Sequence, residues 1–379
     1  MVRHGLAGHD GGSGAQRAGR GAAGYRVRRG GPACARAGGG GVSRQAPEVL
    51  ARAGELVRPA LIEAVDRLPG ELAVPVRYHF GWTDAHGAAL PERSGGKGVR
   101  GALAVLSAEA AGAAPEVAIP GAVGVELIHN YSLIHDDIVD GDVERRHRPT
   151  VWKVYGTDNA VIIGDAVMAL AFEVLLAETT PPRAAAAADL ARATAAMIAG
   201  QSQDMTLHSR PSVSVADCWE MISLKTGALL NHASAVGAIL ADAPEATVQA
   251  LRRYGDEVGR GFQAADDLLG IWGRPEVTGK AAGNDLRERK RSLPVTVALN
   301  SGLPGASELA DLYSRDHLDE EDLVRAAVLI EELGGRSATA AAARRCMENA
   351  LEAVASAGVG AAAAAELQDL AAFIVDRDH

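Results

Sequence analysis

Two aspartates four residues apart, Asp136 and Asp140, close a largely apolar stretch that runs from residue 125 to residue 139. On a helix, residues with this spacing lie on one face, so the two carboxylates would point the same way. Like charges this close repel one another unless a cation lies between them, and ligation by oxygen alone suits Mg²⁺. The spacing predicts a divalent-metal site; the alternative is a solvated helix end that only carries acids.

A second acidic pair, Asp266 and Asp267, closes another apolar segment and is followed directly by Leu268 and Leu269. These hydrophobic neighbours distinguish the pair from an acidic run on a surface. Two acidic clusters at the ends of apolar helices suggest facing walls of one cavity. Metal ions between the walls would bind a polyphosphate, because Mg²⁺ prefers a few carboxylates together with phosphate oxygens and waters.

Amphipathic helices are the elements that must position these acids. From Pro47 onward apolar residues recur at helical spacing, beginning with Val49, Leu50, Ala53 and Leu56. Pro or Gly marks the breaks between the patterns, and no segment alternates as a strand would. The sequence therefore predicts one all-α domain over residues 46–379. Its long helices are expected over residues 99–112, 118–140, 159–178, 183–208, 215–240, 245–271, 292–301, 320–333 and 337–356.

Residues 1–45 differ from the rest in composition, with 14 glycines and eight arginines against the single acid Asp10. A segment with so few large apolar residues cannot bury enough surface to offset its ordering entropy, so we expect it to be disordered. We interpret it as a dispensable extension; a targeting or docking tail is the alternative. The formal charge of −10 therefore understates how acidic residues 46–379 are.

An acidic body argues against a broad nucleic-acid surface, which would need clustered Lys and Arg. The three cysteines, Cys34, Cys218 and Cys346, form neither a metal-ligand pattern nor a disulfide framework, which favours a reducing compartment. No uninterrupted apolar run approaches the roughly twenty residues of a membrane span, and the N-terminus lacks a hydrophobic signal segment. We expect a cytoplasmic protein with no nucleic-acid partner and no stable membrane anchor.

Both acidic segments resemble the two aspartate-rich motifs of the trans-type prenyl diphosphate synthases, most of all the short-chain geranylgeranyl and farnesyl diphosphate synthases. Other motifs of that family follow in the same order. They are Gly95-Gly96-Lys97-Gly98-Val99-Arg100, His129 seven residues before Asp136, Arg145-Arg146, Gly200 to Asp204, Lys225-Thr226-Gly227, Thr278-Gly279-Lys280 and Asp285 to Lys290. Each motif alone is a weak indication; their shared order and spacing make the resemblance specific.

The resemblance implies an isoprenoid-synthase fold, a bundle of about ten or more helices around a central cavity, and a homodimer. It implies a prenyltransferase that acts on isopentenyl diphosphate and an allylic diphosphate, with three Mg²⁺ ions when the allylic substrate is bound. Asp136, Asp140 and Asp266 would ligate the metal. Lys97, Arg100, His129 and Arg146 would bind isopentenyl diphosphate, and Arg145, Lys225 and Lys280 would contact the allylic diphosphate.

In this reaction the metal ions would act as Lewis acids on the leaving diphosphate while the allylic C–O bond breaks. Thr226 and Gln263 are candidates to stabilise the resulting carbocation through their oxygen dipoles. The double bond of isopentenyl diphosphate then attacks, and a proton is lost to the departed diphosphate, so no protein general base is required. Lys225, Thr226, Gln263 and Lys280 are the predicted catalytic residues.

Two alternatives share the fold: a class I terpene cyclase, and a regulatory subunit of a heteromeric synthase. A cyclase has no reason to keep an isopentenyl diphosphate anchor made by Lys97, Arg100 and His129. A regulatory subunit would carry decayed acidic motifs, whereas both motifs here keep their leading pair of aspartates. The sequence therefore favours the transferase.

Product length is predicted from Tyr131 and Ser132, which a chain growing from the metal site would meet on the same helix. The ring of Tyr131 would close the floor of the pocket and the small Ser132 would leave room beside it; the alternative is that Tyr131 is ordinary core. By resemblance the expected product is geranylgeranyl diphosphate, with farnesyl diphosphate next. One departure concerns the second motif, where Gly270 replaces the third aspartate of many family members and puts the strength of the third-metal site in doubt.

Overall fold

The structure is a computed structural model that describes residues 46–90, 96–207, 210, 212–273, 283–315 and 317–375. Lys280 and Gly95 lie outside these residues. The same is true of residues 1–45, so the prediction of a disordered extension remains a prediction.

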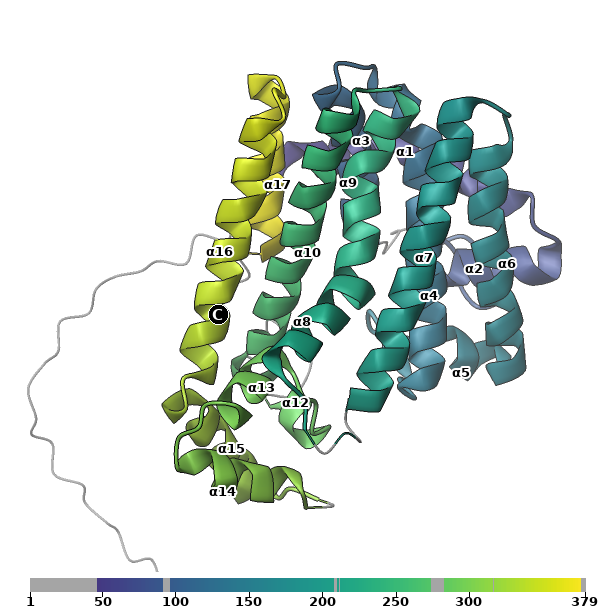
Figure 1. The fold of residues 1–379 in the computed structure, drawn as a ribbon. Coiled ribbons are helices and arrows are strands. Elements are labelled where there is room, and N and C mark those ends of the chain that lie inside the picture. Colours follow the sequence, from purple (N-terminus) through teal and green to yellow (C-terminus); the bar gives the residue numbers. More distant parts are fainter. Residues whose placement is uncertain are drawn as a thin grey trace, which may run out of the picture. The chain divides into compact units, whose positions relative to one another are not determined.

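The described part of the chain is built almost entirely from helices, which confirms the all-α prediction (Figure 1). The helices of the described chain follow the long predicted segments closely and also include several that the sequence did not predict. They are α1 Glu48–Asp66, α2 Gly70–His79, α3 Val99–Ala110, η1 Pro115–Ala118, α4 Ile119–Val139, α5 Val151–Tyr155, α6 Thr157–Leu176, α7 Pro181–Leu207, α8 Val215–Ile222, η2 Ser223–Gly227, α9 Ala228–Leu240, α10 Glu245–Trp272, α12 Asn284–Arg287, α13 Leu293–Leu299, α14 Gly305–Tyr313, α15 Glu320–Glu332, α16 Gly335–Ser356 and α17 Ala361–Val375.

Two local expectations were wrong. The single helix expected over residues 215–240 is divided by η2, a π-helical turn that contains Lys225 and Thr226. The expectation of no strand fails at β1, Glu144–Arg145, and β2, Arg148–Pro149, which pair antiparallel in a short hairpin. In the first case a π-turn lies between α8 and α9, and in the second a tight two-residue turn joins two short strands after α4.

The main hydrophobic core lies where α3, α4, α9 and α10 pack together, with α6 against α4 and α16 against α10 (Figure 1). Large side chains such as Leu103, Leu127 and Tyr254 are completely buried there. Glycines allow the closest crossings. A Cβ at Gly237 would overlap the carbonyl oxygen of Ala104, so α9 can approach α3 this closely only because residue 237 has no side chain.

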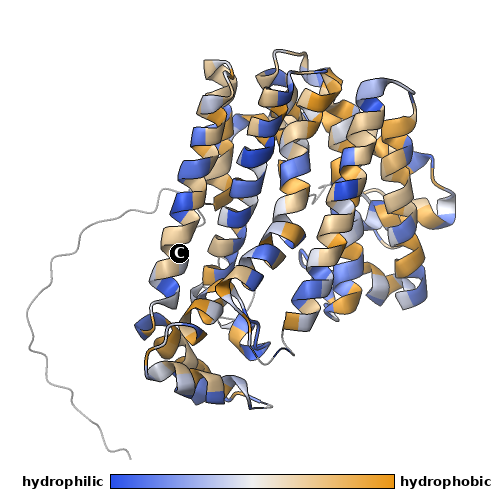
Figure 2. Ribbon diagram, viewed as in Figure 1, coloured by the Kyte–Doolittle hydropathy of each residue, from blue (hydrophilic) through white to orange (hydrophobic). Residues whose placement is uncertain are grey.

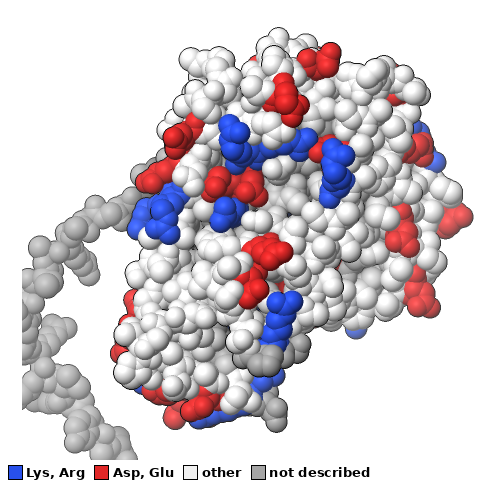
Figure 3. All heavy atoms as spheres, in the orientation of Figure 1, with Lys and Arg blue, Asp and Glu red and all other residues white. Residues whose placement is uncertain are grey.

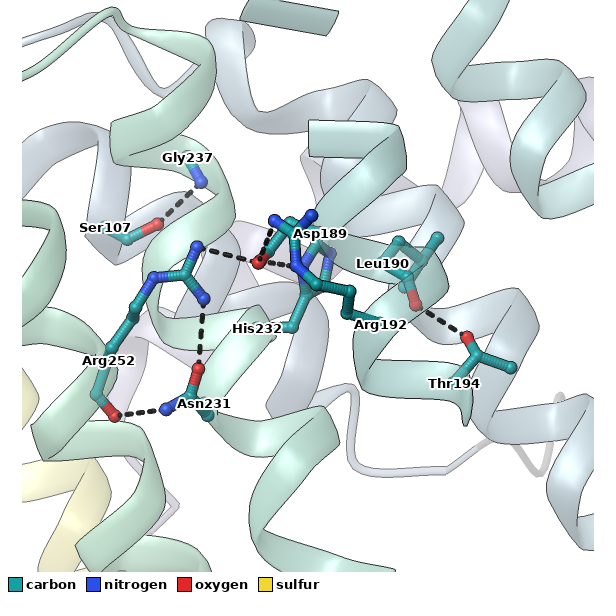
Figure 4. Close-up of polar contacts among 9 residues, drawn as sticks. All are labelled: Ser107, Asp189, Leu190, Arg192, Thr194, Asn231, His232, Gly237 and Arg252. Carbon is teal, nitrogen blue, oxygen red and sulfur yellow. Dashed lines mark hydrogen bonds and ion pairs between the residues drawn. The ribbon is translucent and has the colours of Figure 1, made fainter. Parts of the chain in front are cut away.

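A buried polar network ties α7, α9 and α10 together (Figure 4). Asp189 accepts hydrogen bonds from Arg252 at 2.7 Å and shares a 2.7 Å bond with Nδ1 of His232, whose side chain is fully buried. Asn231 completes the network through Arg252. Asp189 lies fifteen residues before Asp204 on α7, about 22 Å along the helix, so the network stabilises the bundle at a distance from the aspartates.

The surface differs between regions. On the face seen in Figure 3, Lys and Arg lie close to Asp and Glu in small mixed clusters. Helix α6 is coloured largely as hydrophobic in Figure 2 and exposes Val161, Ile162 and Leu176. By length and composition, two helical segments could cross a membrane: Pro115–Val139, with 61% of its window buried, and Thr157–Leu176, with 39%. The first is a core helix of the bundle, and the second presents an apolar surface that needs another explanation.

Candidate active site

A cavity of about 560 Å³ lies between α1, α3, α4, the β1–β2 hairpin, α10 and α17. This volume is in the range of small-molecule sites. Its walls combine apolar side chains with all four of the side chains predicted to bind isopentenyl diphosphate. The predicted residues that line it are Lys97, Arg100, His129, Arg145, Arg146 and Asp266.

The first aspartate-rich motif occupies the last turn of α4. Gly141 takes a left-handed conformation (φ +68°), and the N–H of Asp142 donates to the carbonyl oxygen of Asp137 at 3.0 Å. These are the features of a Schellman C-cap, which ends the helix directly after Asp140. The cap therefore fixes where the two outer aspartates stand.

The three aspartates of this motif have different surroundings. Asp137 is buried and binds Arg145, with Nε and Nη2 both 2.7 Å from its Oδ1. Asp136 and Asp140 face the same side, as their spacing predicted, and within the described chain neither carboxylate has a hydrogen-bond or ion-pair partner. Asp137 thus positions Arg145, while the outer pair remains available to a ligand.

The electrostatics of the outer pair favour a bound cation. Burial raises the pKa of Asp136 to about 6; Lys225 opposes this shift and the negative charge of Asp140 adds to it. The pKa of Asp140 is also raised by burial, against the effect of Lys225 and Lys290. Burial and mutual repulsion make the charged forms of these two carboxylates unfavourable. A divalent cation bound between them would offset both effects.

The acidic side chains of the two motifs are suitable ligands for Mg²⁺. Within the described ranges, no three His, Cys, Asp or Glu side chains are grouped closely enough to hold a metal by themselves. Mg²⁺ does not require such a cage, since it is commonly bound by one or two carboxylates, substrate phosphates and waters. The Asp136–Asp140 pair at the end of α4 and Asp266 on α10 are residue types that fit that donor set.

Lys225 and Thr226 lie on the π-turn η2. Nζ of Lys225 is 2.6 Å from Oδ2 of Asp204 on α7, and Oγ1 of Thr226 donates to Oε1 of Gln263 on α10 at 2.8 Å. π-turns inside α-helices occur frequently at functional sites, where they redirect a side chain. The turn places these two side chains toward two different neighbouring helices.

The second aspartate-rich motif divides its pair in the same way as the first. Asp266 is exposed and lines the cavity. Asp267 is buried; it accepts a hydrogen bond from Nε2 of Gln263 at 2.9 Å and another from the N–H of Leu293 at 2.8 Å, at the start of α13. Burial raises the pKa of Asp267 to about 7 in spite of these bonds. Asp267 connects α10 to α13, and Asp266 lines the cavity.

Arg146 also lines the cavity and lies in an unusual turn. Arg146 and His147 form the two-residue turn between β1 and β2, with φ +52° and +60°. A type I′ hairpin turn requires positive φ at both positions, which Asn and Gly adopt far more readily than Arg or His. The turn brings the Arg146 guanidinium against Gly96, where a Cβ would lie 2.9 Å from Nη2.

His129 and Arg100 share this cationic region. Burial, followed by the charges of Arg100 and Arg146, holds the pKa of His129 well below its usual value. His129 is therefore neutral at pH 7 and can donate one hydrogen bond without adding charge. Nε of Arg100 is buried with no hydrogen-bond partner among the residues described.

Two residues in this region were missed by the sequence prediction. Oε1 of Glu126, one turn before His129 on α4, accepts the N–H of Gly101 at 2.9 Å, and its charge favours the ionised form of Arg100. The ring of Phe373, on α17, lies 4.9 Å from Nζ of Lys97. Glu126 lies one helical turn before His129, so the helical spacing of the sequence could have identified Glu126. No local sequence pattern could have predicted that α17 approaches Lys97.

Glu126→Gln should lower the free energy of unfolding of the ligand-free protein by about 1–3 kcal/mol, because Arg100 and Arg146 lose a nearby counter-charge. Bound isopentenyl diphosphate would replace that charge, so it should raise the Tm of the variant more than that of the wild type. Thermal unfolding followed by circular dichroism measures both effects. Glu55→Gln, at an exposed position of α1, is the matched control. Equal ligand shifts in the variant and the wild type would contradict this role.

The predicted chain-length residues lie on the buried side of α4. The side chain of Tyr131 is only 8% exposed and meets the His135 ring edge-on at 4.8 Å. His135 in turn lies over Gly164 of α6, where a Cβ would overlap its Nε2. Ser132 donates to the carbonyl oxygen of His129 at 2.8 Å. Tyr131 and His135 together fill the space between α4 and α6.

Comparison with known proteins places this geometry in a family. Residues 89–330 match the polyprenyl synthetase family. A (2E,6E)-farnesyl diphosphate synthase of Mycobacterium tuberculosis is 45% identical over 340 residues, covering 89% of this chain and 94% of that protein. A geranylgeranyl diphosphate synthase of the same species is 40% identical over 332 residues, covering 87% and 93%.

Solved structures agree with the sequence comparison. A polyprenyl synthetase from Streptomyces coelicolor superposes with a TM-score of 0.81 and 48% identity, over 86% of this chain and 98% of that one. A geranylgeranyl pyrophosphate synthetase from Pyrococcus horikoshii gives 0.77 and 32% identity, over 87% and 99%. The chain therefore belongs to the polyprenyl synthetase family and is a prenyltransferase with the all-α isoprenoid synthase fold.

Proposed function

We propose that this protein joins isopentenyl diphosphate head to tail to an allylic diphosphate, releasing diphosphate and forming a short-chain prenyl diphosphate. The observation that carries the proposal is the presence of two groups of side chains, one of carboxylates and one of mainly basic residues. Among the described residues, the carboxylates of Asp136 and Asp140 at the end of α4 have no hydrogen-bond or ion-pair partner. Lys97, Arg100, Arg145 and Arg146 line the cavity together with His129, which lies two turns before Asp136 on α4. One set suits a metal-bound diphosphate and the other a diphosphate bound by side chains.

The side chains that would bind diphosphate fall into two sets, so that two substrates, each strongly negative, can be bound together. Lys97, Arg100, His129 and Arg146 would hold isopentenyl diphosphate, with Arg contributing a planar fork and Lys a mobile charge. Arg145 and Lys225 would contact the allylic diphosphate. Lys280 is assigned to the same substrate by resemblance alone, since it lies outside the residues described.

Asp136, Asp140 and Asp266 would hold Mg²⁺, which supplies Lewis-acid stabilisation of the charge that builds on the departing diphosphate. Lys225, fixed by Asp204 at 2.6 Å, adds positive charge beside Asp136 and Asp140. Three ions are proposed with the allylic substrate bound. Loss of activity on chelation, and its recovery with added Mg²⁺, would test the metal requirement.

Thr226 and Gln263 would face the allylic cation. The hydroxyl of Thr226 donates a hydrogen bond to Oε1 of Gln263, so the lone pairs of its Oγ1 can face an electron-poor carbon. Gln263 is itself oriented by its bond to Asp267. The chain from Thr226 to Asp267 holds these oxygens in place before the substrate arrives, which is the form of electrostatic stabilisation that costs no reorganisation.

The decisive experiment incubates the purified protein with Mg²⁺, labelled isopentenyl diphosphate and each allylic starter, then removes phosphate and sizes the alcohols by chromatography. The proposal expects a prenyl alcohol of fifteen or twenty carbons that disappears on chelation. Release of a hydrocarbon from geranylgeranyl diphosphate alone, with no elongation of any starter, would instead show a terpene cyclase. Activity only after a second protein is added would show a regulatory subunit.

Geranylgeranyl diphosphate is the proposed product and farnesyl diphosphate the second choice; relatives carrying each name resemble this chain. If the ring of Tyr131 closes the pocket, Tyr131→Ala should lengthen the main product by at least one five-carbon unit. Mass spectrometry of the dephosphorylated products measures the change. Tyr131→Phe keeps the ring and should leave the spectrum unchanged. A Tyr131→Ala spectrum identical to the wild type would mean that Tyr131 is only core.

A homodimer formed across α6 is also proposed. Val161, Ile162 and Leu176 are 41%, 55% and 51% exposed on a helix of high hydropathy, and burying such side chains is favourable. A second copy of the chain would cover this face. The exposed apolar surface of α6 would then be explained without a membrane anchor, as proposed for a cytoplasmic protein. Ile162→Glu should therefore halve the mass measured by light scattering at micromolar concentration. Val324→Glu, at a 65% exposed site on α15, is the control. A wild type that is already monomeric would contradict the proposal.

A further inference from the structure

The β1–β2 hairpin, which carries Arg145 and Arg146, needs support from outside itself. Each of its strands is two residues long, and both turn residues, Arg146 and His147, have positive φ. A short isolated hairpin is marginally stable, and side chains other than those of Gly or Asn keep a positive φ only where neighbouring contacts enforce it. Contacts between the hairpin and the rest of the fold therefore fix the conformation that presents Arg146 to the cavity.

Some of these contacts connect the hairpin to the end of α4. Oγ1 of Thr150 and Nε1 of Trp152 each donate to the carbonyl oxygen of Asp142 at 2.8 Å. The side chain of Arg145 is bound by Asp137 of α4. These contacts fix β1 and the residues that follow β2.

Arg148 holds β2 itself against the C-terminal end of α2. Its Nη1 donates to the carbonyl oxygen of Tyr78 at 3.0 Å, and its Nη2 donates to that of Thr83 at 2.8 Å. The guanidinium also lies over the ring of Tyr78, 4.2 Å from its centroid. Bridging two carbonyl oxygens in this way suits the planar fork of Arg and not the single ammonium of Lys.

Tyr78 makes the attachment reciprocal. Its hydroxyl donates to the carbonyl oxygen of Pro149, the other residue of β2, at 2.7 Å. The segment that follows Tyr78 contributes Phe80 and Trp82, whose rings stack at 4.7 Å, to the wall of the cavity. β2 is therefore bound to the same segment that forms part of this wall.

The register of the hairpin connects Arg148 to the turn. Arg148 pairs with Arg145 across the two strands, so only Arg146 and His147 lie between them. Like charges in this arrangement destabilise a strand pair unless each is compensated. Asp137 compensates Arg145, and the two carbonyl oxygens receive Arg148. Displacing Arg148 should therefore move Arg146, whereas Arg145 would stay attached to Asp137.

We infer that Arg148 is a positioning residue for isopentenyl diphosphate, because it holds the hairpin turn so that Arg146 faces the cavity beside Gly96. Arg148 is not among the side chains that line the 560 Å³ cavity, so it acts through Arg146. The inference rests on the proposed function for the identity of the ligand. The competing explanations are that Arg148 supplies only positive charge, or only general stability.

Binding of inorganic diphosphate, with chelator present and no metal, tests the inference apart from catalysis. Isothermal titration calorimetry gives the Kd for the full-length protein. Arg148→Lys keeps the charge but cannot bridge both carbonyl oxygens, so this Kd should rise about tenfold. Arg77→Lys, which disturbs an exposed ion pair with Asp66 on the same helix as Tyr78, is the matched control and should change the Kd by less than about twofold. An unchanged Kd in Arg148→Lys, or an equal rise in both variants, would overturn the inference.

A double-mutant cycle tests whether Arg148 acts through Arg146. Arg146→Gln alone should raise the Kd for diphosphate about tenfold. Adding Arg148→Lys to Arg146→Gln should raise it by less than about a further twofold, because the side chain that Arg148 positions is already gone. A second tenfold rise would show that Arg148 acts independently of Arg146 and would contradict the inference.

Tyr78→Phe tests the same attachment without any change of charge. Loss of the bond to Pro149 should raise the Kd for diphosphate about threefold. Tyr155→Phe is the control, because the hydroxyl of Tyr155 donates to the carbonyl oxygen of Ala85 and not to the hairpin. Circular dichroism checks the folding of each variant. If Arg148→Lys is unfolded, the two tyrosine variants decide, and equal Kd values in them would refute the inference.

Steady-state elongation separates the two substrates. In Arg148→Lys the KM for isopentenyl diphosphate should rise about tenfold, while kcat and the KM for the allylic starter should stay within about threefold, because Arg145 keeps its bond to Asp137. An equal rise in both KM values would mean that Arg148 does not act on one substrate through Arg146. If the wild type elongated no starter but its diphosphate binding still depended on Arg148, the proposed function would be wrong and the positioning of Arg146 by Arg148 would stand.

Discussion

Asp136→Asn is expected to lower the rate of chain elongation about 10³-fold, equivalent to about 4 kcal/mol of lost transition-state stabilisation. The substitution keeps the size of the side chain but removes one of the two charges that face the same ligand from the end of α4. The structure gives this carboxylate no hydrogen-bond or ion-pair partner among the described residues, so its loss should break no such contact in the fold. Because Asp136 and Asp140 repel each other in the absence of metal, the variant should be at least as stable as the wild type without Mg²⁺.

The measurement is single-turnover elongation of an allylic starter at several Mg²⁺ concentrations, with the Tm of each protein recorded beside it. Asp142→Asn removes the same charge just beyond the Schellman cap and should change the rate by less than about threefold, since the backbone and not the carboxylate of Asp142 makes the local contacts. A loss in Asp136→Asn no larger than in Asp142→Asn would contradict the assignment of Asp136. A large fall in Tm would point to a structural role instead.

The positions of the acids on the fold could be predicted because their geometry is local. Asp136 and Asp140 share a face on any α-helix, and an apolar stretch that ends in acids places those acids where a buried helix emerges from the core. The positions of the long helices followed from the same periodicity. Which aspartate of each motif is buried and paired could not be predicted from the sequence. That Asp137 pairs with Arg145, and Asp267 with the start of α13, depends on segments eight and 26 residues away.

The features that the sequence did not reveal are contacts between distant segments or unusual backbone conformations. Arg146-His147 is not a dipeptide that predicts a hairpin turn, so the positive φ values at both residues had no signal. Phe373 reaches Lys97 from the opposite end of the chain. Asp285 was identified only as part of a basic stretch, although it lies where the second motif lacks its acid. In each case tertiary packing decides the local arrangement.

The π-turn at Lys225 illustrates how a glycine can determine the chemistry of a residue far from it in sequence. A Cβ at Gly200 of α7 would overlap the backbone nitrogen of Lys225 and lie 2.7 Å from the carbonyl carbon of Leu224. Backbone atoms cannot move aside as a side-chain end can. The absence of a side chain at residue 200 therefore lets η2 lie directly on α7, which is the arrangement that brings Lys225 within 2.6 Å of Asp204.

Gly200→Ala should consequently cost about 1–3 kcal/mol of stability through overpacking and lower the elongation rate about 10²-fold, because a shift of about 1 Å in η2 misplaces both Lys225 and Thr226. The substitution adds one methyl group and removes no charge, so a fall in rate would report position alone. Gly70→Ala, at an exposed helix start with nothing within 4 Å of the added carbon, should be neutral or slightly stabilising. Stability is measured by urea unfolding and the rate by single turnover with saturating substrates. If Gly200→Ala lost stability but kept its single-turnover rate, the π-turn could tolerate displacement, and the close packing of α7 on η2 would serve the fold and not the reaction.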